Sequence, residues 1–146
     1  MDTFGLLRIA DKVGVPVYNF KTSNKKAFCT QGAVALDFCR VETDRECKEL
    51  LAEEMGHVMT DACYPLWSCD SRLYRQNIQR AERKAKECSF RLLVPLMELK
   101  KAIDDGLDDQ EIAERLDISL GLLRKAVEYY RARNLLPEAN NADDYS

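Results

Sequence analysis

The chain has 146 residues, which suits a single domain with a moderate core. Hydrophobic residues make up 46% of it and charged residues 32%, a balance typical of soluble globular proteins. It contains no apolar run as long as a membrane span and begins without the features of a signal peptide, so we expect a cytoplasmic protein. The net charge of −3 disfavours a dedicated nucleic-acid binder, because such proteins neutralise phosphates with basic side chains.

The first half of the sequence predicts a small sheet between two helices. Apolar residues at helical spacing predict a short amphipathic helix over 3–13, with Gly14 as its stop signal. Three segments rich in strand formers follow, "VPVYNF", "KAFCTQ" and "AVALDFCRV", with a turn between the first two. Thr43 and Glu46 fit a capping box, which begins a second helix that should run to about Thr60.

The second half predicts helices only. Residues 61–71 are typical of a loop, and a long helix follows over about 72–93. Its apolar face consists of Tyr74, Ile78, Ala81, Ala85, Cys88 and Leu92. A further helix is expected over 95–104. Residues 110–130 then show the core pattern of a helix-turn-helix at Ile112, Ala113, Leu116, Ile118, Leu123 and Ala126. The acidic tail 137–146 has no apolar face and is expected to be disordered.

The stretch "LLAEEMGHVMT", residues 50–60, differs in one essential letter from the zinc-protease motif H-E-x-x-H. Glu53 and His57 are four residues apart and therefore project from one face of a helix, with Glu54 beside them. Zinc proteases use this geometry to draw two ligands from one helix, next to a carboxylate that accepts a proton from water. Carboxylate oxygen is an acceptable zinc ligand, so Glu53 can replace a histidine, although its charge should make a bound water less acidic.

A third ligand has to come from elsewhere in the chain. His57 is the only histidine, so the remaining ligands must be carboxylates or thiolates. Glu82 is the best candidate, because it flanks the apolar face of the long helix and can face back toward His57. Cys63 is a minor candidate; the six cysteines include no C-x-x-C pair and are expected to be reduced and mostly buried. The alternative interpretation is a chance match, since a single E-E-x-G-H also occurs on helices without metal.

Residues 3–130 resemble the ImmA/IrrE family of zinc metallopeptidases. The order is similar throughout: a short helix, "GVPVY", a small sheet, the "LAEEMGH" helix and a helix that ends in "RLLVP". The family pattern E-x-x-A-x-x-(F/W)-A-x-x-L-(L/I)-x-P corresponds here to Glu82, Ala85, Cys88, Ser89, Leu92, Leu93 and Pro95. Cys88 stands in place of the usual aromatic residue.

The resemblance implies an α+β, zincin-like fold of the minimal gluzincin type, in which the small sheet packs on the active-site helix. It implies Zn²⁺ held by His57 and Glu82, with Glu54 as the catalytic base. Glu53 departs from the usual histidine, although one branch of similar sequences also has glutamate there. We expect a peptidase core over 1–105 with the helical pair 106–136 packed on it. The implied substrate is a helix-turn-helix repressor of a phage or mobile element.

Two other functions remain open from the sequence. The chain could bind such a repressor without cleaving it, or it could be a DNA-binding regulator that uses residues 110–130. Asp117 stands where the tight turn usually has glycine, which favours a structural role for this helical pair over DNA binding. Tyr64 and Tyr74 are both candidates for a hydrogen-bond donor to the transition state. The oligomeric state is not determined by the sequence.

The long helix also has a basic surface, formed by Arg72, Arg75, Arg80, Arg83, Lys84 and Lys86. Such a run is more often a solvated helix face than a binding site. If it is functional, we expect it to bind an acidic partner.

Overall fold

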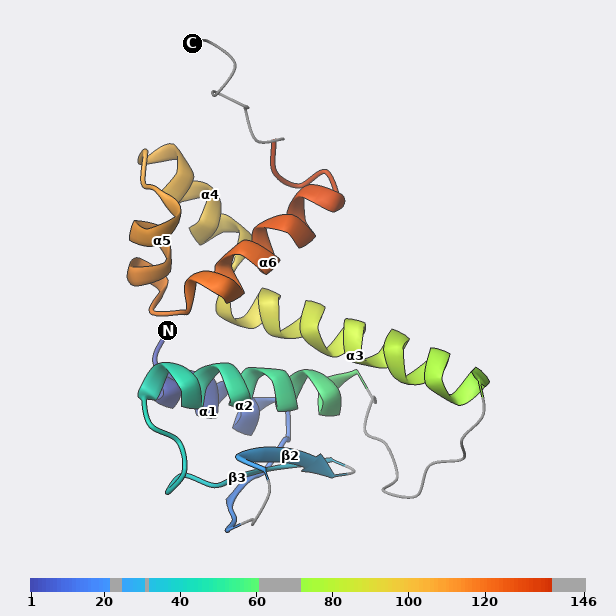
Figure 1. The fold of residues 1–146 in the computed structure, drawn as a ribbon. Helices are drawn as coiled ribbons and strands as arrows, with labels where there is room; N and C mark the ends of the chain where they lie inside the picture. Colours follow the sequence, from blue (N-terminus) through green and yellow to red (C-terminus); the bar gives the residue numbers. More distant parts are fainter. Residues whose placement is uncertain (22–24, 31, 61–71, 138–146) are drawn as a thin grey trace.

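The computed structural model describes residues 1–21, 25–30, 32–60 and 72–137, without the side chains of 72–74 (Figure 1). This part of the chain combines six helices with one three-stranded sheet, which confirms the predicted α+β class. The elements are α1 (Thr3–Lys12), β1 (Val17–Asn19), β2 (Ala27–Thr30), β3 (Ala33–Leu36), α2 (Asp44–Met59), α3 (Arg72–Leu93), α4 (Leu96–Asp104), α5 (Asp109–Leu116) and α6 (Leu120–Ala132). None of the described helices is long and apolar enough to cross a membrane.

Every predicted helix and strand is present in the expected order, although the third strand ends at Leu36 and not at the end of the predicted segment 33–41. The predicted loop over 61–71, with Cys63 and Tyr64, lies outside the described residues, as does the predicted tail from residue 138 onward. Among the described cysteines, Cys47 is buried, Cys29 and Cys88 are half-buried and Cys39 is exposed; none of these four forms a disulfide. The expected burial of the thiols is therefore only partly met.

The sheet has the strand order β1-β3-β2, so β3 lies in the centre. β1 runs parallel to β3 and β2 runs antiparallel to it, with Val34 opposite both Val17 and Cys29. Val34 and Leu36 are fully buried, as expected for alternate residues that face the core. α2 packs on this face of the sheet and contacts α3 on its other side (Figure 1). α2 is thus the central layer of the molecule, between the sheet and α3.

The capping box at the start of α2 forms in a modified way. The Thr43 side chain accepts a hydrogen bond of 3.0 Å from the Glu46 backbone N–H, as predicted. The Glu46 carboxylate accepts from the N–H of Glu42 at 2.9 Å and forms an ion pair with Lys26, instead of turning back to Thr43. A tertiary contact explains this difference. Lys26, the residue before β2, pairs with the Glu46 carboxylate and orients it toward the sheet.

The helical pair α5–α6 is held against α2 through the turn that joins the two helices. Asp117 adopts the left-handed conformation at this turn, with φ 53°, where glycine was the expected residue. Its carboxylate accepts hydrogen bonds from Arg45 at 3.1 Å and from the fully buried Lys48 at 3.2 Å. Glu49 accepts a further bond of 2.6 Å from the Ser119 backbone N–H. Three residues of α2 therefore hold this turn through hydrogen bonds: Arg45, Lys48 and Glu49.

One buried cluster extends from α1 to the end of α6. The six residues predicted as the core of the helical pair are all buried. At the other end of α6, the Tyr130 hydroxyl donates a hydrogen bond of 2.7 Å to the Val94 carbonyl, just after α3. The C-terminal helices are thus anchored to the rest of the molecule at both ends of α6.

Candidate metal centre

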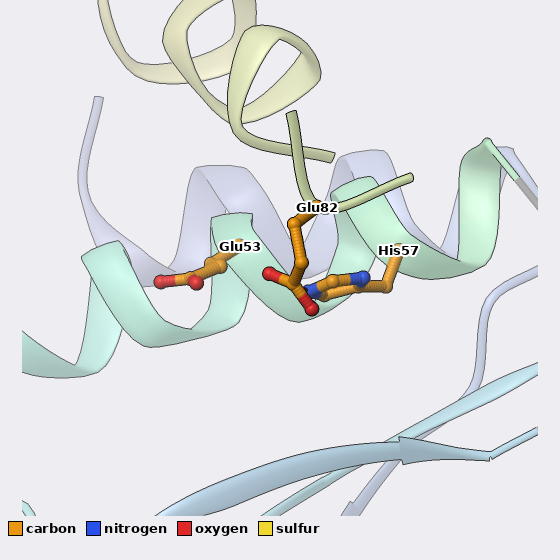
Figure 2. Close-up of side chains that lie close together, drawn as sticks. All are labelled: Glu53, His57 and Glu82. Carbon is orange, nitrogen blue, oxygen red and sulfur yellow. Dashed lines mark ion pairs between the residues drawn. The ribbon is translucent and has the colours of Figure 1, made fainter. Parts of the chain in front are cut away.

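Glu53, His57 and Glu82 meet at the contact between α2 and α3. Glu53 and His57 lie one helical turn apart on α2, and Glu82 reaches them from α3 (Figure 2). One potential ligand atom from each of the three residues lies within 4.8 Å of the other two. The group predicted from motif spacing is therefore brought together by the fold, and it is a set of ligands that could hold a metal ion.

The three residues do not contribute equally to this arrangement. Nε2 of His57 lies 3.5 Å from Oε2 of Glu82. Two ligands of a tetrahedral zinc ion lie about 3.4 Å apart, given metal–ligand distances of about 2.1 Å. In Figure 2 the Glu82 carboxylate lies against the imidazole, whereas the Glu53 carboxylate points along α2 away from it. His57 and Glu82 thus already have the spacing of two ligands, while Glu53 must rotate its side chain to join them.

The surroundings of His57 favour a ligand on its ring. The residue is 7% exposed, and Nδ1 is buried without a hydrogen-bond partner among the described residues. Nε2 faces Glu82 at a distance beyond the usual range of a hydrogen bond. A buried polar ring without hydrogen bonds is costly, and a cation between Nε2 and Glu82 would remove part of that cost. In a metal-bound histidine, the second ring nitrogen usually donates a hydrogen bond to an acceptor that orients the ring. The described residues provide no such acceptor for Nδ1 of His57.

Gly56 determines how closely α3 approaches this group. A β-carbon at Gly56 would lie 2.3 Å from the backbone carbonyl oxygen of Ala85, a distance that no real contact allows. The two helices therefore cross with their backbones in direct contact. Ala85 follows Glu82 by three residues, so the crossing places the Glu82 carboxylate over the histidine that follows Gly56. The glycine and alanine of the motif have a packing function that the sequence analysis did not identify.

Glu54 lies next to this group and on the side of the sheet. Burial raises the pKa of the Glu54 carboxyl group, and the negative charges of Glu53 and Glu82 raise it further. His57 and a hydrogen bond with the Cys29 thiol of β2 act in the opposite direction. A carboxyl group with a raised pKa binds a proton more strongly, which suits a general base. Cys29 had no signal in the sequence, because its contact with Glu54 depends on how β2 packs on α2.

The remaining candidates are not placed by the structure. Cys63 and Tyr64 lie outside the described residues, and the side chain of Tyr74 is not described. No protein-family model, no curated protein and no solved structure matches this chain.

Proposed function

We propose that this chain is a zinc-dependent endopeptidase of the ImmA/IrrE type, with a zincin-like fold, that works in the cytoplasm. The observation that carries the proposal is the convergence of Glu53, His57 and Glu82, with Glu54 beside them. The proposed substrate is a helix-turn-helix repressor of a phage or mobile element, and this part of the proposal rests on the resemblance alone.

The ligand set suits zinc better than the common hard cations. Magnesium and calcium prefer oxygen ligands throughout, whereas imidazole nitrogen together with carboxylate oxygen is a usual zinc combination. When bound, zinc polarises a carbonyl group and makes water more acidic. His57 and Glu82 would hold it, and Glu53 would complete the set after rotation of its side chain.

Glu54 would move the proton in this reaction. Its carboxylate accepts a proton from the attacking water and later donates that proton to the leaving amine. The raised pKa of the Glu54 carboxyl group suits this role, because a higher pKa means that the group binds the transferred proton more strongly.

The first test is elemental analysis of the protein purified after zinc supplementation. We expect one zinc per chain, and loss of that zinc in His57→Ala with little change in helix content. A parent protein that holds no zinc would overturn the proposal. Cleavage of a candidate repressor by the zinc-loaded protein, followed by mass spectrometry of the products, then tests the peptidase activity itself.

A second candidate function is repressor binding without cleavage. The orientation of the Glu53 carboxylate, which points away from His57, favours it (Figure 2). In that case the protein would form a complex with the repressor and leave it intact even when saturated with zinc.

DNA binding by α5–α6 is less well supported. A helix-turn-helix meets DNA with the N-terminal residues of its second helix. Here the turn before α6 is bonded to α2, and the carboxylates of Glu49 and Asp117 lie at that end of α6.

A further inference from the structure

A groove of about 500 Å³ lies between α3 and α6, and Glu82 of the candidate metal centre is one of its lining residues. One face of α3 and one face of α6 form its walls, since the residues concerned recur at helical spacing on each helix. Glu82 belongs both to the groove wall and to the metal group. A segment bound in the groove would therefore lie next to the metal centre.

The floor of the groove is aromatic and held in place. The rings of Phe90 and Tyr129 lie 5.7 Å apart, and the Tyr129 hydroxyl accepts a hydrogen bond of 3.0 Å from Arg91. The guanidinium group of Arg133 lies 4.8 Å from the centre of the Tyr129 ring, and Arg133 itself forms a 3.0 Å ion pair with Glu87. These contacts preorganise an apolar surface, so little side-chain entropy would be lost when it binds an apolar group.

The rim of the groove carries an excess of available positive charge. Arg83 and Lys86 on α3 and Lys125 on α6 are exposed and line the groove. Within the described part of the chain, none of these three cations lies within ion-pair distance of a carboxylate. The acidic residues of the groove are Glu82, Glu87 and Glu128. Glu87 is paired with Arg133, which leaves Glu82 and Glu128 against three cations.

We propose that this groove binds a segment of the substrate protein in which an apolar or aromatic side chain is flanked by carboxylates. The apolar side chain lies on Phe90 and Tyr129, and the carboxylates pair with Lys86, Lys125 and Arg83. The inference deepens the proposed function and rests on it for the cleavage that would follow. Binding itself needs no metal, because Glu82 is the only member of the metal group in the groove wall. The net charge of −3 favours such a peptide over nucleic acid, because nucleic-acid binders neutralise phosphates with basic side chains.

The test uses short fluorescein-labelled peptides and the full-length protein. One peptide carries a phenylalanine between pairs of glutamates, a second has glutamines in place of the glutamates, and a third has alanine in place of the phenylalanine. A labelled single-stranded oligonucleotide of the same length is the nucleic-acid probe. Fluorescence anisotropy is measured in chelator and again with zinc. We expect the first peptide to bind most tightly under both conditions.

Charge reversal locates the binding site. Lys86→Glu and Lys125→Glu should each weaken binding of the first peptide roughly three- to tenfold, because an attraction becomes a repulsion. Lys100→Glu, an exposed lysine of α4 away from the groove, is the matched control and should leave binding unchanged. Circular dichroism establishes that all three variants are folded.

The inference is overturned if the first peptide does not bind at its highest soluble concentration, or if it binds no better than the glutamine peptide. Equal effects of the control and groove variants, or tighter binding of the oligonucleotide, also overturn it. The proposed function has a separate readout in zinc content. Peptide binding without zinc retention would contradict the proposed peptidase function and support the groove as a binding site. Zinc retention without peptide binding would contradict the binding site and leave the proposed metal centre standing.

Discussion

Gly56 of α2 and Ala85 of α3 bring two helix backbones into direct contact, so that a β-carbon on Gly56 would lie 2.3 Å from the Ala85 carbonyl oxygen. Backbone atoms cannot yield as a flexible side chain can. Any side chain at position 56 must therefore move α3, and with it the Glu82 carboxylate, away from His57. The spacing of the metal group depends on this contact as much as on the ligands themselves.

Gly56→Ala should separate α2 from α3 and weaken zinc binding. We expect a loss of about 1–3 kcal/mol in the free energy of unfolding, typical of overpacking in a tight core. Urea denaturation and a zinc titration measure the two effects. Gly121→Ala is the matched control, because a β-carbon there has no neighbour within 4 Å and lies at the start of α6. That variant should be neutral or up to about 1 kcal/mol more stable; equal behaviour of the two variants would contradict the packing argument.

Glu54→Gln should keep the zinc and lose hydrolysis. The amide has nearly the same shape as the carboxylate but cannot accept a proton. Loss of a general base typically lowers the rate by about 10²–10⁴. Zinc content and cleavage of the repressor are measured on the same preparation. Parental cleavage rates in this variant would exclude Glu54 as the base.

Glu53→His should restore the usual two-histidine motif at the same position on α2. Imidazole is neutral, so bound water should become more acidic and cleavage should rise or shift to lower pH. Zinc titrations of the parent, Glu53→His and Glu53→Ala are compared. Unchanged affinity in both variants would show that Glu53 is a bystander, in line with its orientation away from His57. Strong binding by Glu53→His alone would indicate that the natural protein acts without metal.

The contact between α2 and the α5–α6 turn should make the protein less stable in acid. Hydrogen bonds from Arg45 and Lys48 hold the pKa of Asp117 below its ordinary value of 3.8. A carboxyl group with a lowered pKa in the folded state contributes stability above its ordinary pKa. That contribution is lost as the pH falls through the lower, folded value.

Asp117→Asn tests this assignment. Asparagine also tolerates the left-handed conformation at position 117, so the turn should be retained while the charge is lost. Urea denaturation between about pH 6 and pH 3 should show the parent losing more stability than the variant at the acid end. Parallel curves for the two proteins would mean that the Asp117 carboxylate does not contribute to the acid sensitivity.

Much of the local structure was determined by the sequence itself. The order of helices and strands, the cap at Thr43 and the placement of Glu53 and His57 on one helix face all depend on residues within one or two turns of each other. The periodicity of a helix and the geometry of a cap are local properties, and neighbouring residues are sufficient to specify them. The turn at Asp117 belongs to the same class, since its neighbours predicted a turn although the residue is not glycine.

The sequence indicated Glu82 as the residue that faces His57, but only the tertiary structure decided how closely these local features meet. The approach of Glu82 to His57 depends on the crossing of α2 and α3 at Gly56, and the contact of Cys29 with Glu54 depends on the packing of β2. The buried Lys48 and the groove beside Glu82 likewise arise from surfaces that are distant in the sequence. Their positions follow from how whole side-chain layers fit together, and no short-range pattern encodes that fit.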